Sequence, residues 1–373
     1  MLIDTTLREG AQLFGAYFSG PAKEAIVDGL LALGVDELEI GWVGQDGLGD
    51  FIRTIRPRCG RTHLSVWTPC RERDIRAASA LGVNRVNIGV PVSELHMAER
   101  LDADRDTLKE RLASTVLTAR LMGISYISVG LEDVSRADLA FSLEAARLAA
   151  DMGASRIRLA DSLGILTPLD MANLVSIFRA ELPKTDLAVH CHDDFGMATA
   201  NAATALASGA DYADASVLGI GERSGIAATE ELAAHITLRK EAEHAYRTEA
   251  IRNLCDTVSQ AAGIPIPRTK AVAGKDIFAC ESGIHAHALT KSPALFEPYD
   301  PNRVGACRTV AVGGKSGRAA IADALDQTGL ARQDHDIPTL LRAVREHAHR
   351  LRRPLTPGEF ARLARSAGKD MPC

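Results

Sequence analysis

Residues 187–196 read LAVHCHDDFG, an apolar run that ends in two histidines separated by one residue. Side chains on a β-strand alternate between its two faces, so His190 and His192 point in the same direction. Two imidazoles on one face at a strand end can bind one divalent metal ion. A hydrogen-bonded pair of buried histidines is the other explanation of the pattern, and the rest of the chain decides between the two.

Strand-like and helix-like segments alternate through about the first 240 residues, which is typical of an α/β protein. The segments that read as strands are residues 2–4, 35–40, 63–67, 85–90, 125–129, 156–161, 187–190 and 212–217. Pro21 opens and Gly34 closes one amphipathic helical segment between them. Ser135 is the expected N-cap of another helix, which ends at Gly153. Eight such units with no ninth favour a (β/α)8 TIM barrel over an open, doubly wound sheet.

The pattern changes after the eighth predicted strand. A helical segment at residues 248–262 is followed by a proline-rich link and by a stretch rich in proline and glycine up to Lys315. Two or three further helices end the chain. We therefore expect a TIM-barrel catalytic domain over residues 1–245 and a mainly helical lid or C-terminal subdomain over residues 246–373.

The composition argues against several classes of protein. The chain has 373 residues, 46% of them apolar, and a net charge of −5, so it lacks the basic footprint of a nucleic-acid-binding protein. No apolar run of about 18 residues predicts a membrane span, and residues 1–4 lead into a strand rather than a signal peptide. The seven cysteines form no C-x-x-C pair, which predicts reduced thiols and a cytoplasmic protein.

Catalytic sites of TIM barrels lie at the C-terminal ends of the strands, so the polar residues near those ends are the first candidates for chemistry. They are Arg8, Glu9, Glu39, Trp67, Arg71, Glu132, Asp161, Ser162, His190, His192, Glu222 and Arg223. The set contains the carboxylates, imidazoles and guanidinium groups that metal, acid–base and anion-binding sites use.

Four motifs resemble those of the homocitrate synthase/2-isopropylmalate synthase family, the DRE-TIM metallolyases. They are DTTLREGAQ at residues 4–12, HCHDDFG at 190–196, GIGERSG at 219–225 and ESGIH at 281–285. Each motif alone is weak, but the four follow the family's order along nearly the whole chain. LEDVSRAD at residues 131–138 is similar to the nitrogen-fixation branch of the family. The resemblance implies a TIM barrel with a C-terminal extension.

The family joins the methyl group of acetyl-CoA to the keto carbon of a 2-oxoacid and then hydrolyses the thioester. A divalent metal ion (Mg, Mn or Zn) can polarise the ketone in such a reaction. The resemblance implies that Glu9, His190 and His192 bind this ion. One carboxylate and two imidazoles leave coordination positions open for a chelating 2-oxoacid.

Arg8, Glu222 and His285 take catalytic roles by the same resemblance. Arg8 is implied to hold the keto or alkoxide oxygen. His285 is the implied base that deprotonates acetyl-CoA, with Glu222 beside it to orient the imidazole. An ion pair between Glu222 and Arg223 is the alternative role of those two residues. Because His285 belongs to the extension, we expect a lid that closes the barrel mouth, crossing between the subunits of a homodimer.

Substrate contacts are assigned to Arg8, Gln12, Arg71, Glu132 and Ser162. Ser162 stands where the family usually has threonine, and a helix N-cap is its alternative role. Other positions depart from the family pattern. Ile226 replaces an asparagine that contacts the metal in many members, and Ser128 matches an arginine of the lysine-pathway enzyme. Cys280 and Phe296 replace a histidine and a tyrosine, so the tyrosine's part in catalysis is open.

A pocket with Trp42, Trp67, Arg71 and Arg136 suits a dicarboxylate, so 2-oxoglutarate, which gives homocitrate, is the first choice of substrate. The alternatives are oxaloacetate in a Re-type citrate synthase, a related 2-alkylmalate or phosphonomethylmalate synthase, and a CoA-ester lyase on the same barrel. The ESGIH segment favours a synthase over a lyase. Small-molecule partners alone are expected, namely acetyl-CoA and the 2-oxoacid, with no nucleic acid and no membrane.

Overall fold

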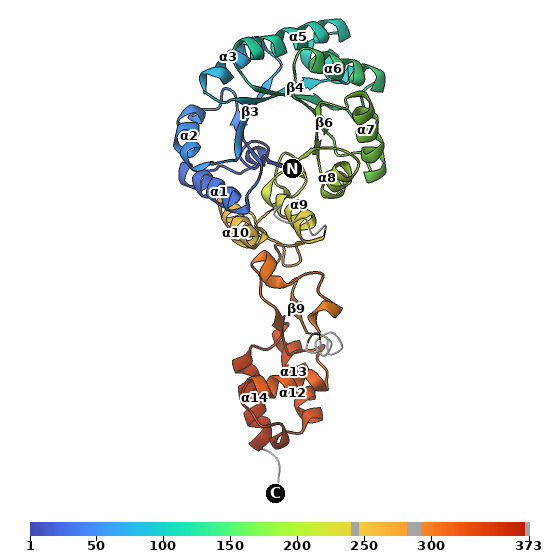
Figure 1. Cartoon of the computed structure of the whole chain (residues 1–373). Helices are drawn as coiled ribbons and strands as arrows, with labels where there is room; N and C mark the ends of the chain where they lie inside the picture. Colours follow the sequence, from blue (N-terminus) through green and yellow to red (C-terminus); the bar gives the residue numbers. More distant parts are fainter. Residues whose placement is uncertain (240–245, 282–288, 290–291, 370–373) are drawn as a thin grey trace. The chain divides into compact units, whose positions relative to one another are not determined.

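The computed structural model describes residues 1–239, 246–281, 289 and 292–369. Eight parallel strands close into a barrel in the order of the chain, and helices cover its outside (Figure 1). The strands are β1 (Leu2–Asp4), β2 (Glu37–Trp42), β3 (His63–Pro69), β4 (Arg85–Pro91), β5 (Tyr126–Glu132), β6 (Arg156–Asp161), β7 (Asp186–Cys191) and β8 (Tyr212–Ala215). The predicted (β/α)8 TIM barrel is confirmed.

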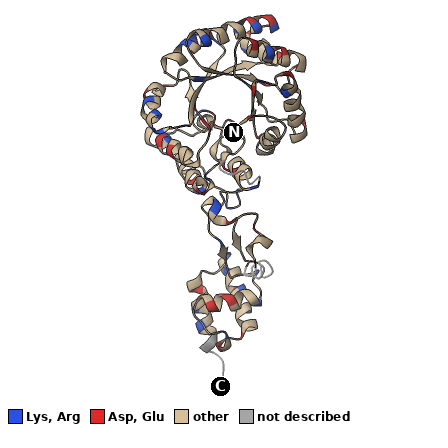
Figure 2. Ribbon diagram, in the orientation of Figure 1, with Lys and Arg blue, Asp and Glu red and all other residues tan. Residues whose placement is uncertain are grey.

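The helices of the barrel turn their apolar faces to the strands, and acidic and basic residues are interspersed over their outer faces (Figure 2). They are α1 (Gly20–Leu33), α2 (Leu48–Ile55), α3 (Glu72–Ala80), α4 (Glu94–Leu101), α5 (Arg105–Leu121), α6 (Leu139–Asp151), α7 (Pro168–Glu181), α8 (Ala198–Ala207), α9 (Thr229–Ala234) and α10 (Ile251–Ala262). In the described part of the chain, every helix is too short or too polar to cross a bilayer.

Two predicted helix ends can be compared with the structure. α1 has Pro21 in its first turn and ends at Gly34, whose φ of 89° lies in the left-handed region, so both signals are confirmed. The prediction that Ser135 is the N-cap of α6 is wrong. Asp138 is the N-cap, and its side chain accepts the hydrogen bond from Phe141 N at 2.8 Å. The chain makes a turn before this helix, and Ser135 lies within that turn.

Ion pairs fill part of the barrel interior. β2 and β6 each place two charged side chains at alternating positions, which is the spacing of one strand face. Arg156 donates from Nη1 and Nη2 to both oxygens of Glu37, at 3.0 and 2.9 Å, and Arg158 donates to Glu39 at 2.9 Å. Burial would raise the pKa of Glu37, but the charge of Arg156 outweighs it and lowers the pKa to about 2. Buried charges of this kind persist only when they are well paired.

The chain divides into two compact units after Ile266. The barrel unit includes α10, which packs on α1 where Leu254 fills the space beside Gly29. The boundary therefore falls later than the predicted one after residue 245. In the second unit, β9 (Ala279–Cys280) pairs in parallel with β10 (Thr309–Val310).

The second unit has its own apolar core. Among the described residues of this unit, the α-helices are α12 (Arg318–Gln327), α13 (Ile337–Leu351) and α14 (Pro357–Lys369). Ile321, Leu340 and Phe360, one from each helix, are buried in this core. The predicted helical C-terminal extension is confirmed.

Candidate active site

Three side chains that can ligate a metal converge from two strand ends. Glu9 follows β1, His190 lies on β7, and His192 comes directly after that strand. One ligand atom from each residue lies within 4.8 Å of the other two. The Nε2 atoms of the histidines are 3.3 Å apart, and Glu9 Oε2 is 4.0 Å from His190 Nε2. A metal–nitrogen bond is about 2.1 Å long, so one ion can contact both imidazoles.

The electrostatics of the cluster favour the forms of these residues that bind metal. Burial, and after it the neighbouring His190, lower the pKa of His192 to about 3, so its imidazole is neutral at pH 7. Burial would raise the pKa of Glu9, but Arg8 and the two histidines outweigh it and lower the pKa to about 2. A neutral imidazole beside an ionised carboxylate is a donor set that fits a divalent cation.

Asp214 on β8 orients the ring of His190. Its Oδ2 lies 2.8 Å from His190 Nδ1, and a proton on that nitrogen leaves Nε2 available as a ligand. The same oxygen accepts from Arg158 Nη1 at 3.0 Å, and Arg158 also binds Glu39. Arg8 Nε donates to the other oxygen of Glu39 at 2.6 Å. A continuous set of ion pairs therefore holds the cluster in place.

Two glycines allow the backbone to approach the cluster closely. Gly164 has a φ of 61°, and a Cβ there would lie 2.6 Å from His192 O. A Cβ on Gly221 would lie 3.1 Å from Glu9 Cγ. The adjacent backbone N–H of Glu222 donates to Glu9 Oε1 at 3.1 Å, which fixes the carboxylate. The glycines of these loops therefore serve the geometry of the cluster.

A cavity of about 400 Å³ opens beside the cluster. Most of the residues predicted for the site line it, namely Arg8, Glu9, Gln12, Glu132, Ser162, His190, His192 and Glu222. His285 is the exception that cannot be placed, because it lies outside the described residues.

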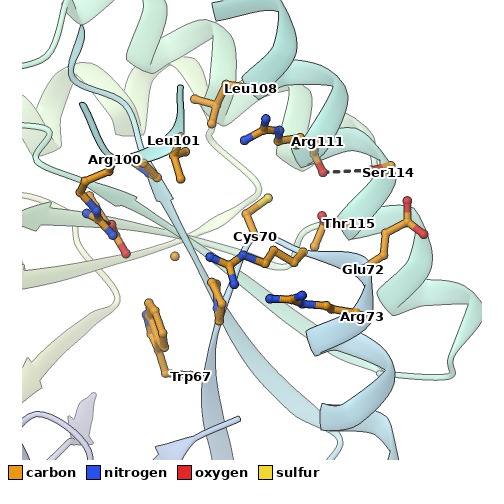
Figure 3. A pocket seen from close by; sticks show the side chains of 15 residues that line it. Trp67, Cys70, Glu72, Arg73, Arg100, Leu101, Leu108, Arg111, Ser114 and Thr115 are labelled. Carbon is orange, nitrogen blue, oxygen red and sulfur yellow. Dashed lines mark hydrogen bonds and ion pairs between the residues drawn. The ribbon is translucent and has the colours of Figure 1, made fainter. Parts of the chain in front are cut away.

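A second cavity, of about 530 Å³, adjoins the first and shares Trp67 and Arg100 with it. Trp67 and Arg100 lie on one side of this space, and side chains from α5 such as Arg111 lie on the other (Figure 3). The predicted residue Arg71 lines this second cavity rather than the first. Arg136, predicted for the same pocket, lines neither of the two cavities.

Several predicted polar residues have protein partners that define their local role. Ser162 Oγ accepts the backbone N–H of Asp133 at 2.9 Å, so it is not a helix N-cap. Arg223 pairs with both oxygens of Asp194, each at 2.9 Å, rather than with Glu222. Glu132 Oε2 accepts a hydrogen bond from Arg100 Nη1 of α4 at 3.0 Å.

Sequence reasoning missed several residues of the first cavity: Asn87, His96, Arg100, Arg158 and Asp214 beside it. His96 and Arg100 lie on α4, a helix that was not predicted. Asp214 is the one charged residue of β8, and Arg158 alternates with Arg156 on β6. Such charges within a barrel strand were the available signal for an inward-facing polar residue.

Comparisons with known proteins agree with this geometry. The HMGL-like family model matches residues 1–258, and the model described as homocitrate synthase post-HMGL domain-like matches residues 272–352. A homocitrate synthase of Frankia sp. (strain FaC1) is 36% identical over 98% of this chain and 90% of its own. The 2-phosphonomethylmalate synthase of Streptomyces rubellomurinus is 34% identical over 92% of each chain.

Solved structures show the same fold. The HMG-CoA lyase of Pseudomonas aeruginosa covers 71% of this chain and 93% of its own, with a TM-score of 0.64 and 23% identity. The HMG-CoA lyase of Bacillus subtilis covers 72% and 95%, with a TM-score of 0.65 and 20% identity. The two family models and the similar synthases, together with the four sequence motifs, show that the chain is an enzyme of the HMGL-like, DRE-TIM family, in its homocitrate synthase/2-isopropylmalate synthase group.

Proposed function

We propose that the protein is an acyltransferase that condenses acetyl-CoA with a 2-oxo-dicarboxylate and then releases CoA. The preferred 2-oxoacid is 2-oxoglutarate, and the product is homocitrate. The observation that carries the proposal is the convergence of Glu9, His190 and His192 beside a cavity that is also lined by arginines. The similarity to homocitrate synthases over nearly the whole chain supports the choice of product.

Glu9, His190 and His192 would hold a divalent ion, Mg, Mn or Zn. When bound, the ion supplies Lewis-acid polarisation of the keto group and stabilises the alkoxide that forms. The chain prepares the site before any ligand arrives, because Asp214 fixes the ring of His190 and the N–H of Glu222 fixes the carboxylate of Glu9. The ligands therefore need little reorganisation on binding.

Arg8 is proposed to donate to the keto or alkoxide oxygen. It lines the cavity while its Nε is held by Glu39 at 2.6 Å and its Nη1 by Glu9. A guanidinium fixed in this way is a preorganised donor, which stabilises developing negative charge without moving during the reaction. The carboxylates also keep its charge partly neutralised until substrate enters.

Contacts to the substrate are proposed for Gln12, Ser162, Glu132 and Arg71. Ser162 Oγ already accepts an N–H, so its own proton remains to donate to a carboxylate. Glu132 acts through Arg100, which it holds at the edge of both cavities. Arg71 lines the larger cavity, next to Trp67. The larger cavity is therefore assigned to substrate as well.

His285, with Glu222 beside it, is proposed as the base that removes a proton from the methyl group of acetyl-CoA. Glu222 lines the cavity. His285 ends the ESGIH motif, which begins at Glu281 in the second unit. We also propose a cytoplasmic homodimer whose lid segments cross between subunits. Cysteines of the described residues form no disulfide, which supports a reducing compartment.

A substrate panel tests this function. Purified protein with a divalent metal is incubated with acetyl-CoA and, in turn, 2-oxoglutarate, oxaloacetate, 2-oxoisovalerate and phosphonopyruvate, while thiol release is followed. We expect the highest kcat/KM with 2-oxoglutarate. We expect no thiol release in the presence of a chelator. Preference for oxaloacetate or phosphonopyruvate would replace the proposed substrate. If none of the four 2-oxoacids supports thiol release, the proposed synthase activity is wrong.

A further inference from the structure

Arg158 on β6 carries hydrogen-bonding capacity that the barrel does not use. Its side chain is 2% exposed and lines the smaller cavity. Nη1 binds Glu39 at 2.9 Å and Asp214 at 3.0 Å, whereas Nε and Nη2 have no hydrogen-bond partner among the described residues. Arginine stays charged when buried, and unmet donors are costly there. A ligand that accepts from both nitrogens would remove that cost.

Arg156, two positions earlier on the same strand, provides the contrast. It is as deeply buried, but its Nη1 and Nη2 bind both oxygens of Glu37, and its Nε donates to Ser128 Oγ at 3.1 Å. It does not line the cavity. An arginine of this barrel interior can therefore be fully satisfied by protein groups, so the unused donors of Arg158 are specific to its place at the cavity.

The wall of the cavity beside Arg158 is built from small residues. β4, β5 and β6 contribute Gly89, Gly130 and Ala160, and Gly130 is the ladder partner of Arg158. Gly130 has no positive φ, and a Cβ there would meet no atom closer than Asn87 Oδ1 at 3.5 Å. Neither backbone conformation nor crowding requires glycine at this position. Its consequence is open space in the cavity.

The unused donors also lie close to the proposed metal site. Asp214 Oδ2 contacts both Arg158 Nη1 and His190 Nδ1, so a single carboxylate separates the guanidinium from a proposed metal ligand. Nε and Nη2 together form one edge of the guanidinium fork, the arrangement that binds a carboxylate with two parallel hydrogen bonds. A 2-oxoacid held at the metal by its keto group would extend the rest of its chain into this cavity.

We infer that Arg158 binds the second carboxylate of the 2-oxo-dicarboxylate and thereby selects it over monocarboxylic 2-oxoacids. The inference rests on the proposed function and names the residue that determines its specificity. The space kept by Gly130 admits the distal part of the substrate. The ion pairs of Arg158 with Glu39 and Asp214 hold the fork in a fixed orientation, which limits the entropy lost on binding.

The test compares two five-carbon acids, 2-oxoglutarate and 2-oxopentanoate, which differ in the distal carboxylate. Their binding to the metal-loaded full chain is measured by calorimetry without acetyl-CoA. Arg158→Lys keeps the charge but removes the fork, so we expect affinity for 2-oxoglutarate to fall about 10- to 100-fold and affinity for 2-oxopentanoate to stay the same. Arg156→Lys is the matched control and should keep the wild-type ratio. An unchanged ratio in Arg158→Lys would overturn the inference.

Gly130→Val provides a second variant, which leaves every residue of the ion pairs unchanged. We expect it to fold with normal metal affinity, because the site has room for a Cβ, and to bind 2-oxoglutarate at least about tenfold more weakly by filling the cavity. Melting temperatures show whether each variant is folded. If wild type releases thiol with 2-oxoglutarate while Arg158→Lys keeps the wild-type affinity ratio, the inference alone fails. If wild type releases no thiol with any 2-oxoacid, the proposed function fails with it.

Discussion

At the scale of single residues, carboxylates do different work according to their partners. Asp214 is buried beside two cations or potential cations, and its pKa is lowered because Arg158 and His190 outweigh the effect of burial. Asp4 is equally buried but has only neutral donors, Thr229 Oγ1 at 2.7 Å and Thr6 N at 2.9 Å. Burial therefore dominates at Asp4 and raises its pKa to about 6.

Replacing Asp214 should weaken metal binding although every proposed metal ligand is kept. Asp214→Asn removes the charge that orients His190, and losses of this kind cost about 10- to 100-fold in metal affinity. Competition with a chromogenic chelator measures the change. Asp211→Asn is the control, because Asp211 directly precedes the same strand and pairs with Arg179 away from the cluster. Equal metal affinity in Asp214→Asn and wild type would contradict the role of Asp214.

Asp4 should make the protein less stable as the pH rises. Its folded-state pKa of about 6 lies above the usual aspartate pKa of 3.8, so the folded state binds the proton more tightly. The stabilising effect is complete below the unfolded pKa and is lost as the pH rises through about 6. Between pH 5 and pH 7 the free energy of unfolding should fall by about 1 kcal/mol more in wild type than in Asp4→Asn. Urea denaturation at both pH values measures this change, and an equal fall in the two proteins would refute the prediction.

At the scale of elements, the loop after β6 supports the end of β7. Gly164 has a φ of 61°, and a Cβ there would press on the backbone of His192 and Asp194, at 2.6 and 2.9 Å. Gly196 has a φ of 74° but no atom within 4 Å of its would-be Cβ. The two glycines thus share a backbone conformation and differ in crowding.

Substituting these two glycines separates the effect of backbone strain from the effect of displacing His192. Gly196→Ala should lower the free energy of unfolding by about 1 kcal/mol and keep metal affinity, because only the left-handed conformation is penalised. Gly164→Ala should be less stable still and should also lose metal affinity, because it moves His192. Urea denaturation and metal titration measure both effects. Equal metal affinity in the two variants would show that the loop does not position the histidine.

The sequence predicted the elements that follow simple periodicity. Alternation on β7 aligned His190 and His192, and the DTTLREG motif supplied Glu9, so the cluster itself was predictable. The contacts of Arg158 were not, because barrel closure alone brings β6 opposite β2 and β8. His96 and Arg100 were missed for a different reason: α4 is a short additional helix in a stretch where no helix was expected.

At the scale of the whole molecule, the proposed base and the proposed metal ligands belong to different units of the chain. Glu9, His190, His192 and Glu222 lie in the barrel unit, and the ESGIH motif begins in the second unit. Catalysis by His285 therefore requires the second unit of the same or of another subunit to reach a barrel mouth.

Mixing two inactive variants distinguishes these cases. If lids cross in a homodimer, a dimer of one Glu222→Gln chain and one His285→Ala chain contains one intact site. We expect the variants, each nearly inactive, to recover up to about one quarter of wild-type thiol release after subunit exchange, since half of random dimers are mixed and each has one site in two. Light scattering verifies the dimer. No recovery after proven exchange would exclude crossing lids.

The central claim is that the Glu9–His190–His192 site joins acetyl-CoA to a 2-oxo-dicarboxylate. The most direct test incubates the protein with acetyl-CoA labelled with ¹³C in both acetyl carbons, 2-oxoglutarate and a divalent metal, and analyses the products by mass spectrometry. The account predicts homocitrate that carries both labelled carbons, formed by wild type and absent with chelator or with His192→Ala. Labelled acetate without homocitrate, or homocitrate formed equally well by His192→Ala, would contradict it.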